Sequence, residues 1–475
     1  MNKKKSWNLL ILVVALSLLL PAYARASYPA EVFRTGETKC YNVVGLRIPC
    51  SGTGQDGDIR AGMPWPWPRF IDNWDGTVTD RLTGLEWTKD AGAVKPWPEA
   101  FDYVKALTTG GHNDWRLPNA IELQSLIDDS RAYPALPRPN PFKNVWSTGC
   151  DMSLTSCDYT TSDAWVMHMG DGVVFYEGRT NNVFIWPVRS ETCGASYESY
   201  NKSFMGLQSM DRASTVASDK NHDGDLDYHF ALGLFNGSSL ADLNPMLSTG
   251  KVLPSDSIRD GAVNWKLALD YIKKLNEESY LGYADWRLPN KNELRSLVDY
   301  SRSVPSLPPN TPFTNLQSDN YWSSTTRTGY PYCVMPVNIY NGRVTSNYKW
   351  QSLYVWPVRG GQLAASDASA VCLPKTGQTK CYNEAGEIIT CAGTGQDGEL
   401  QAGIAWPDPR FTDRGDGTVI DNLTGLVWTK DANLMLTRDP EFDAPNDPCS
   451  CQGPPVQCWL KIIRNLLARG SFSAK

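Results

Sequence analysis

The sequence predicts an α+β protein assembled from repeated units, each with two helices followed by short antiparallel strands. Three observations lead to this fold class. Residues 35–92 and 376–433 align without a gap and are identical at 38 of 58 positions. The string "DWRLPN" occurs at 114–119 and 285–290, with apolar residues at helical spacing on both sides. Asp-Gly and Asn-Gly pairs flanked by β-branched and aromatic residues indicate hairpins.

The chain begins with the features of a cleaved secretory signal. Three lysines precede an apolar run from Leu9 to Leu20 and the small-residue string "PAYARA". No stretch reaches the roughly 20 apolar residues that a membrane-spanning helix needs, so we expect no transmembrane segment. We expect removal of residues 1–26 and a location in the periplasm, at the cell surface or outside the cell.

The charge balance limits the partners. The formal net charge of the chain is −6, and loss of the signal removes four positive charges, which lowers it to −10. An acidic protein argues against nucleic acid and anionic lipid as main partners.

Most of the 12 cysteines of such an exported protein are expected to form disulfides. Cys40 and Cys50 repeat the spacing of Cys381 and Cys391, so each pair is expected to close its own loop. A third candidate pair is Cys150 and Cys157. The last three cysteines lack paired C-x-x-C spacing, which favours disulfides or thiols over a zinc site at Cys449, Cys451 and Cys458.

Each repeat unit is read from a small set of local signals. The segment "RFIDNWDGTVTDRLTGLEW" predicts a hairpin around its Asp-Gly pair. Apolar residues at helical spacing predict one helix over 97–107, matched by 265–275, and a second helix after each DWRLPN string. The strings "WSTG" at 146 and "WSST" at 322 are taken as equivalent, and alternating residues from there to "WPVR" predict strands.

The DWRLPN strings are interpreted as structural motifs. Asn119 precedes the second helix and Glu122 follows three residues later, which is the Asn-x-x-Glu form of a capping box, and Asn290 and Glu293 reproduce it. The Trp and Leu of each string are expected in the core. The Arg is expected to pair with a nearby Asp.

The repeats divide the chain into six segments. They are the signal peptide (1–26), a first module with its disulfide loop and hairpin (27–190), an intermodule insert (191–254), a second module whose beginning is replaced (255–361), a small-residue linker (362–375), and a truncated third module with a basic tail (376–475). The third copy is expected either to be less stable than the others or to dock against one of them. Its amphipathic tail fits a reading-frame change as well as a designed terminus, and a membrane-surface helix is the functional alternative.

One stretch carries metal chemistry. "DKNHDGDLD" places oxygen-bearing residues at alternate positions, with Gly224 allowing a sharp turn. We expect a calcium ion there, and the alternative is a solvated acidic turn. Phe230 stands where a full EF-hand has Glu, so a shorter extracellular calcium loop is the closer pattern. The expected ligands are Asp219, Asn221, Asp223, the carbonyl of Asp225, and Asp227.

The strings "DGTVTDRLTGLEW", "DWRLPNAIELQSLID", "YWSST" and "WPVR" resemble the C-terminal domain of the Legionella collagen-like adhesin, the Lcl C-terminal-domain family, long described as a domain of unknown function. The resemblance covers roughly 70–190 and 255–360, with the opening of a third copy. The order of two helices, a W-R-[LV]-P string, "YWSS" and a closing "VR" is also similar to the C-type-lectin-like fold shared with the formylglycine-generating enzymes. The resemblance therefore implies tandem C-type-lectin-like modules.

These observations favour an exported, non-enzymatic binding or adhesion protein that recognises a glycan, such as a polysaccharide or a cell-surface glycan, or another cell-surface partner through its repeated modules. The adhesin implies sulfated glycans, but this chain is acidic and has no Lys/Arg cluster in either complete module. The alternatives are an exported enzyme on the same fold and a purely structural envelope protein. A polar constellation in one module only would favour the enzyme. The sequence contains neither G-x-S-x-G nor H-E-x-x-H, and it leaves the ligand and the oligomeric state open.

Overall fold

The computed structural model describes residues 30–146, 150–157, 162–190, 261–361, 371–440 and 442. The signal peptide, the insert with its calcium loop, and the C-terminal cysteines and tail lie outside these residues. We call residues 70–190 module A, residues 261–361 together with 411–440 module B, and residues 30–65 and 371–406 leader A and leader B.

Module A contains two sheets and two helices. The hairpin predicted around Asp75-Gly76 forms, and its strands join the last strand of the module in the antiparallel order β11-β5-β4-β3. A second sheet has the order β6-β10-β7-β8-β9. The elements are β3 (Phe70–Asp72), β4 (Thr77–Asp80), β5 (Leu85–Thr88), β6 (Ala93–Lys95), α3 (Trp97–Lys105), η1 (Thr109–Gly111), α4 (Ala120–Ser125), β7 (Cys150–Ser156), β8 (Asp163–His168), β9 (Val174–Gly178), β10 (Val183–Ile185) and β11 (Val188–Ser190).

Module B repeats the helices and the hairpin sheet of module A, but the third copy supplies its hairpin. In place of the five-stranded sheet it has two two-stranded sheets, β12-β14 and β13-β15. The last strand of the second copy, β16, pairs with β21, and the sheet order β16-β21-β20-β19 repeats that of module A. The third copy is therefore docked, and it replaces the beginning that the second copy lacks. The elements are α8 (Trp265–Glu277), η3 (Tyr280–Gly282), α9 (Lys291–Ser296), β12 (Asn320–Tyr321), β13 (Cys333–Val334), β14 (Val337–Asn338), β15 (Asn347–Tyr348), β16 (Val358–Arg359), β19 (Phe411–Asp413), β20 (Thr418–Asp421), β21 (Val427–Thr429) and α11 (Leu434–Thr437).

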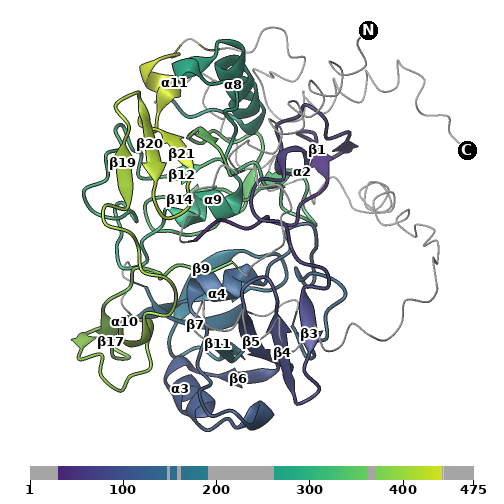
Figure 1. Cartoon of the computed structure of the whole chain (residues 1–475), viewed down its shortest axis with the longest axis vertical. Coiled ribbons are helices and arrows are strands. Elements are labelled where there is room, and N and C mark those ends of the chain that lie inside the picture. The colour runs from purple at the N-terminus through teal and green to yellow at the C-terminus, as the bar shows by residue number, and fades with distance from the viewer. Residues whose placement is uncertain are drawn as a thin grey trace, which may run out of the picture.

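The two leaders lie across the modules in a reciprocal way. Asp56 of leader A accepts a hydrogen bond from Thr325 Oγ1 of module B at 2.6 Å, whereas Asp397 of leader B accepts one from Thr155 Oγ1 of module A at 2.6 Å. Figure 1 shows β1 and α2 beside α8 and α9, and β17 and α10 beside α3 and α4. The leader elements are β1 (Cys40–Tyr41), β2 (Arg47–Ile48), α2 (Asp56–Ile59), β17 (Cys381–Tyr382), β18 (Ile388–Ile389) and α10 (Asp397–Leu400).

The helix caps predicted from the DWRLPN strings are confirmed. Asn119 and Asn290 each complete a capping box with the Glu three residues later. Their Nδ2 groups also donate to leader carbonyls, that of Ala402 for Asn119 and that of Ala61 for Asn290, both at 3.2 Å. The caps therefore join each module to the leader that crosses it.

The prediction that the Arg of each DWRLPN string pairs with an Asp is wrong. Arg116 binds Glu122 through both terminal nitrogens, at 2.7 and 2.6 Å, and Arg287 binds Glu293 in the same way. The reason is that the carboxylate that caps the helix also faces the guanidinium, so one Glu serves both.

Two disulfides are confirmed and one pairing is wrong. Cys40 bonds to Cys50, and Cys381 bonds to Cys391. Cys150 begins strand β7 and Cys157 directly follows it. Seven residues of extended chain span about 20 Å, so these two sulfurs cannot meet.

The expected equivalence of "WSTG" and "WSST" is also wrong. Ser323 and Thr325 of module B bond to Met335 O and to the amide of Lys291. In module A the matching bonds come from Ser153 and Thr155, to Trp165 O and the amide of Ala120. The short Trp-Ser match therefore placed the two modules six residues out of register.

One hydrophobic core runs through both modules. Trp87 packs on Trp186 in module A, and Trp356 packs on Trp428 in module B, with ring centroids 5.8 and 5.4 Å apart. All four side chains are fully buried, in agreement with a core role for tryptophan. Between the modules, Lys291 Nζ lies 2.5 Å from Asp129 Oδ1 in a fully buried ion pair.

Candidate functional site

The repetition of the module provides an internal comparison for finding functional positions. Residues that build the fold occur in both copies, as the caps and the core tryptophans do. Partly exposed polar or aromatic groups that are present in only one copy need another explanation. Two such groups stand out, one in each module.

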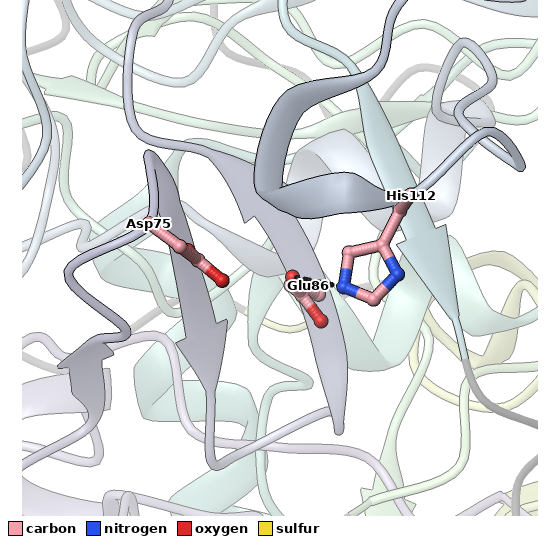
Figure 2. A group of neighbouring side chains, drawn as sticks. All are labelled: Asp75, Glu86 and His112. Carbon is pink, nitrogen blue, oxygen red and sulfur yellow. Dashed lines mark ion pairs between the residues drawn. The ribbon is translucent and has the colours of Figure 1, made fainter.

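Module A carries an acid–histidine cluster, which consists of Asp75, Glu86 and His112. Asp75 comes from the turn between β3 and β4, Glu86 from β5, and His112 from the residue after η1. One potential ligand atom from each side chain lies within 4.8 Å of the other two. Figure 2 shows the three side chains converging at the hairpin, and His112 Nε2 is 3.7 Å from Glu86 Oε1.

Neighbouring groups hold the two carboxylates in place. Asp75 Oδ1 accepts hydrogen bonds from the amide and hydroxyl of Thr77, at 2.9 and 2.6 Å. Glu86 Oε2 accepts from Arg189 NH1 at 2.8 Å, and the same guanidinium binds Asp114 at 2.7 Å. The Arg189 contact uses Oε2 of Glu86, whereas Oε1 is the atom that faces His112. Glu86 and His112 are partly buried, and Asp75 is exposed.

Module B does not repeat the cluster. Asp416 corresponds to Asp75, but Val427 stands in place of Glu86 and Tyr283 in place of His112. Tyr283 donates its hydroxyl to Asp416 Oδ2 at 3.2 Å, and the guanidinium of Arg359 lies 3.7 Å from the centre of the Tyr283 ring. The same backbone thus holds an acid–histidine cluster in one copy and a tyrosine–arginine stack in the other.

Module B carries an aromatic row, which consists of Tyr332, Tyr348 and Trp350. Tyr332 and Tyr348 have ring centroids 6.0 Å apart, and Tyr348 and Trp350 have centroids 4.3 Å apart, with interplanar angles of 19° and 11°. The rings are partly exposed and alternate with buried Cys333 and Lys349, as successive residues of a strand do.

The aromatic row is also confined to one module. The amide of Lys349 bonds to Tyr332 O, and the amide of Arg179 bonds to Ser162 O in the same way, so Ser162 corresponds to Tyr332. By the same register Gly178 and Thr180 of module A take the places of Tyr348 and Trp350. Module A therefore has no ring at any of these three positions.

Buried acids mark the leader contacts rather than an open site. Burial raises the pKa of Asp56 and of Asp397 to about 6, although two threonine hydroxyls bind each carboxylate. Burial also raises the pKa of Glu37 and of Asp151 to about 8. Asp56, Asp397 and Glu37 lie where a leader meets a module, so their raised pKa values reflect this interlock, whereas Asp151 is buried in β7 of module A.

The predicted calcium ligands, Asp219, Asn221, Asp223, Asp225 and Asp227, lie outside the described residues, so this site stays a prediction. The reasoning from sequence missed both groups described above. The signal for the acid–histidine cluster was present in the aligned repeats, where Glu86 is aligned with Val427 in a string that is otherwise identical in the two copies. The partner His112 could not be added without the fold, because it lies outside that alignment.

Comparison with known proteins supports the repeat assignment. The family model described as the Lcl C-terminal domain matches residues 76–189 and 246–359. A search of curated proteins finds no match. Within the described part of the chain, no helix has the length and apolar character required to cross a membrane.

Proposed function

Because this chain carries two copies of the Lcl C-terminal domain, we propose that it is an exported, non-enzymatic adhesin-like protein. In this proposal its modules have a C-type-lectin-like arrangement and bind a polysaccharide or a cell-surface glycan. The observation that carries the proposal is the aromatic row of module B. The two local disulfides support an extracytoplasmic location, because such bonds persist in oxidising compartments.

The aromatic row has the properties of a sugar-stacking surface. The faces of a sugar ring carry C–H groups that pack on aromatic rings, while tyrosine hydroxyls and the indole N–H supply hydrogen bonds at the edge. Tyr332, Tyr348 and Trp350 are partly exposed, and the stacking of Tyr348 on Trp350 covers the facing sides of these two rings, so a sugar would use the outer faces and the edges of the row. Outward rings of this size are costly to leave in water at three adjacent positions, and packing does not require them, since module A lacks them.

A neutral glycan fits this surface better than a sulfated one. Lys349 lies between Tyr348 and Trp350 in the sequence. Its side chain is buried, and its ammonium group donates to the carbonyls of Tyr41 and Asn42 in leader A. Burial lowers its pKa to about 7, which weakens it further as an anion ligand. The chain also has an overall negative charge.

An enzyme is the second candidate function. It is supported by the acid–histidine cluster, because this cluster occurs in one module only. An acid and a base within 3.7 Å, Glu86 and His112, are elements of hydrolytic sites. The cluster itself contains no Ser, Cys or Lys nucleophile, and Arg189 already binds the Glu86 carboxylate. A binding role therefore remains the better proposal.

The test is binding of the full chain to immobilised neutral and sulfated polysaccharides, with Trp350→Ala and Tyr348→Ala as variants. We expect each variant to bind a neutral glycan at least tenfold more weakly, which corresponds to about 1.4 kcal/mol. The matched control is Trp146→Ala in module A, whose ring is 54% exposed and stacks on Phe184 at 5.6 Å. Equal loss in the control, or full binding by Trp350→Ala, would overturn the proposal, and release of sugar fragments would support the enzyme.

A further inference from the structure

We propose that Asp75, Glu86 and His112 of module A bind a single transition-metal ion of the Zn²⁺ type. This site is distinct from the predicted calcium loop and does not depend on glycan binding. It rests on the convergence of three different ligand groups from three separate elements.

The donor set matches the chemistry of Zn²⁺. Zn²⁺ takes imidazole nitrogen and carboxylate oxygen at about 2.0 to 2.2 Å, and three protein ligands with one water form a common open site. Ligand atoms around such an ion lie roughly 3.3 Å apart by tetrahedral geometry. His112 Nε2 and Glu86 Oε1 are already 3.7 Å apart, and Asp75 completes the set within 4.8 Å. Small side-chain rotations would therefore close the site.

Other cations fit less well. Ca²⁺ takes six to eight oxygens and Mg²⁺ takes an octahedral oxygen shell, whereas this cluster offers two carboxylates and one nitrogen. Imidazole instead suits zinc, copper, nickel and iron. The mixed set of ligands thus selects the transition-metal class.

Contacts outside the cluster orient its ligands. Thr77 fixes Asp75 through Oδ1, and Arg189 fixes Glu86 through Oε2. Arg189 also brings a positive charge, but Asp114 pairs with it at 2.7 Å. Such outer contacts are the usual means by which proteins hold metal-binding carboxylates in position.

Module B provides variants that the fold already accepts. Glu86→Val and His112→Tyr copy Val427 and Tyr283 into module A. In module B, where Val427 and Tyr283 are present, Arg359 forms an ion pair with Asp285 at 2.7 Å. Arg189 should therefore keep its ion pair with Asp114 in the two variants of module A. Loss of metal in these variants can therefore be separated from loss of folding.

The experiment is calorimetric titration of Zn²⁺ into the chelator-treated full chain, with each variant checked by thermal unfolding. We expect His112→Tyr and Glu86→Val to lose one equivalent of bound Zn²⁺, or to bind it at least tenfold more weakly, with little change in melting temperature. Tyr283→Phe in module B is the control and should leave Zn²⁺ binding unchanged. His112→Tyr should also retain the glycan affinity of the wild type, which separates this test from that of the aromatic row.

The inference is overturned if folded His112→Tyr binds Zn²⁺ with the affinity and stoichiometry of the wild type. It is equally overturned if substitutions at Asp75, Glu86 and His112 all leave the Zn²⁺ heat of the wild type unchanged, or if the wild type gives no Zn²⁺ heat. Zinc held only by cysteines or by the acidic loop at 219–227 would give that result.

Discussion

Trp428→Ala is expected to destabilise module B as a whole, although residue 428 belongs to the third copy. Trp428 is 0% exposed on β21 and packs on Trp356, whose indole nitrogen donates to Thr429 O at 3.1 Å. Truncation of a buried tryptophan costs about 3 to 5 kcal/mol through lost burial and the cavity that remains. For a unit of this size the melting temperature should fall by on the order of 10 °C.

The assay is thermal unfolding measured by scanning calorimetry, with limited proteolysis in parallel. Trp87→Ala, the counterpart in module A, should give a loss of similar size, and Arg414→Ala in the exposed β19–β20 turn should stay within about 0.5 kcal/mol of the wild type. Trp356→Ala and Trp428→Ala should not be additive, because the two rings touch. Additive losses, or a main transition unaffected by Trp428→Ala, would refute the view that the third copy completes module B.

Three further predictions follow from the caps, the buried acids and the undescribed loop. Asn119→Ala and Asn290→Ala should each cost about 2 kcal/mol in chemical unfolding without changing glycan affinity, because each Asn caps a helix and also binds the opposite leader. Asp397→Asn should become more stable relative to wild type as pH rises from 4 to 7, by roughly 2 kcal/mol. The folded pKa of about 6 lies above the ordinary value, so the stabilising contribution of the protonated carboxyl is complete at low pH and is lost as pH rises through 6, and a difference that does not vary with pH would contradict this. Asp223→Ala should abolish a calcium heat in calorimetry if residues 219–227 form the expected loop.

Local signals account for the parts of the fold that could be predicted from sequence. The capping boxes, the hairpins and the two ten-residue disulfide loops each depend on residues within one short window. The pairing of β16 with β21 depends instead on which of two nearly identical hairpins reaches which module. The β4–β5 and β20–β21 segments differ at few positions, so strand propensity and pattern are the same for either choice. The exchange of leaders has the same cause, since both carry the string GTGQDG with the Asp that binds the opposite module.

The interlock explains why the repeated glycine-rich string is conserved between the leaders. Asp56 and Asp397 each receive one hydroxyl from their own leader, Thr35 or Thr376, and one from the opposite module. A Cβ on Gly57 would lie 2.4 Å from Lys39 O, and on Gly398 2.4 Å from Lys380 O, so the turn requires glycine in both copies. The string therefore joins each leader to the opposite module.

The distribution of differences between the modules separates fold from function. The capping boxes, the tryptophan pairs and the leader contacts are duplicated, and losing either copy would leave a buried polar group or a cavity. The buried Lys291–Asp129 pair between the modules occurs once. Where Glu86 and His112 differ from their counterparts, both modules maintain the same order of the hairpin sheet and the same buried tryptophan pair. The aromatic row instead lies at the two-stranded sheet β13-β15, whose counterpart in module A belongs to a five-stranded sheet. The hairpin sheet therefore forms with or without Glu86 and His112, which supports the proposed zinc site as the reason for these two residues in module A. If each surface binds its own ligand, exchange of Glu86 and His112 with Val427 and Tyr283 should move zinc binding to module B. Exchange of Tyr332, Tyr348 and Trp350 with Ser162, Gly178 and Thr180 should likewise move glycan binding to module A.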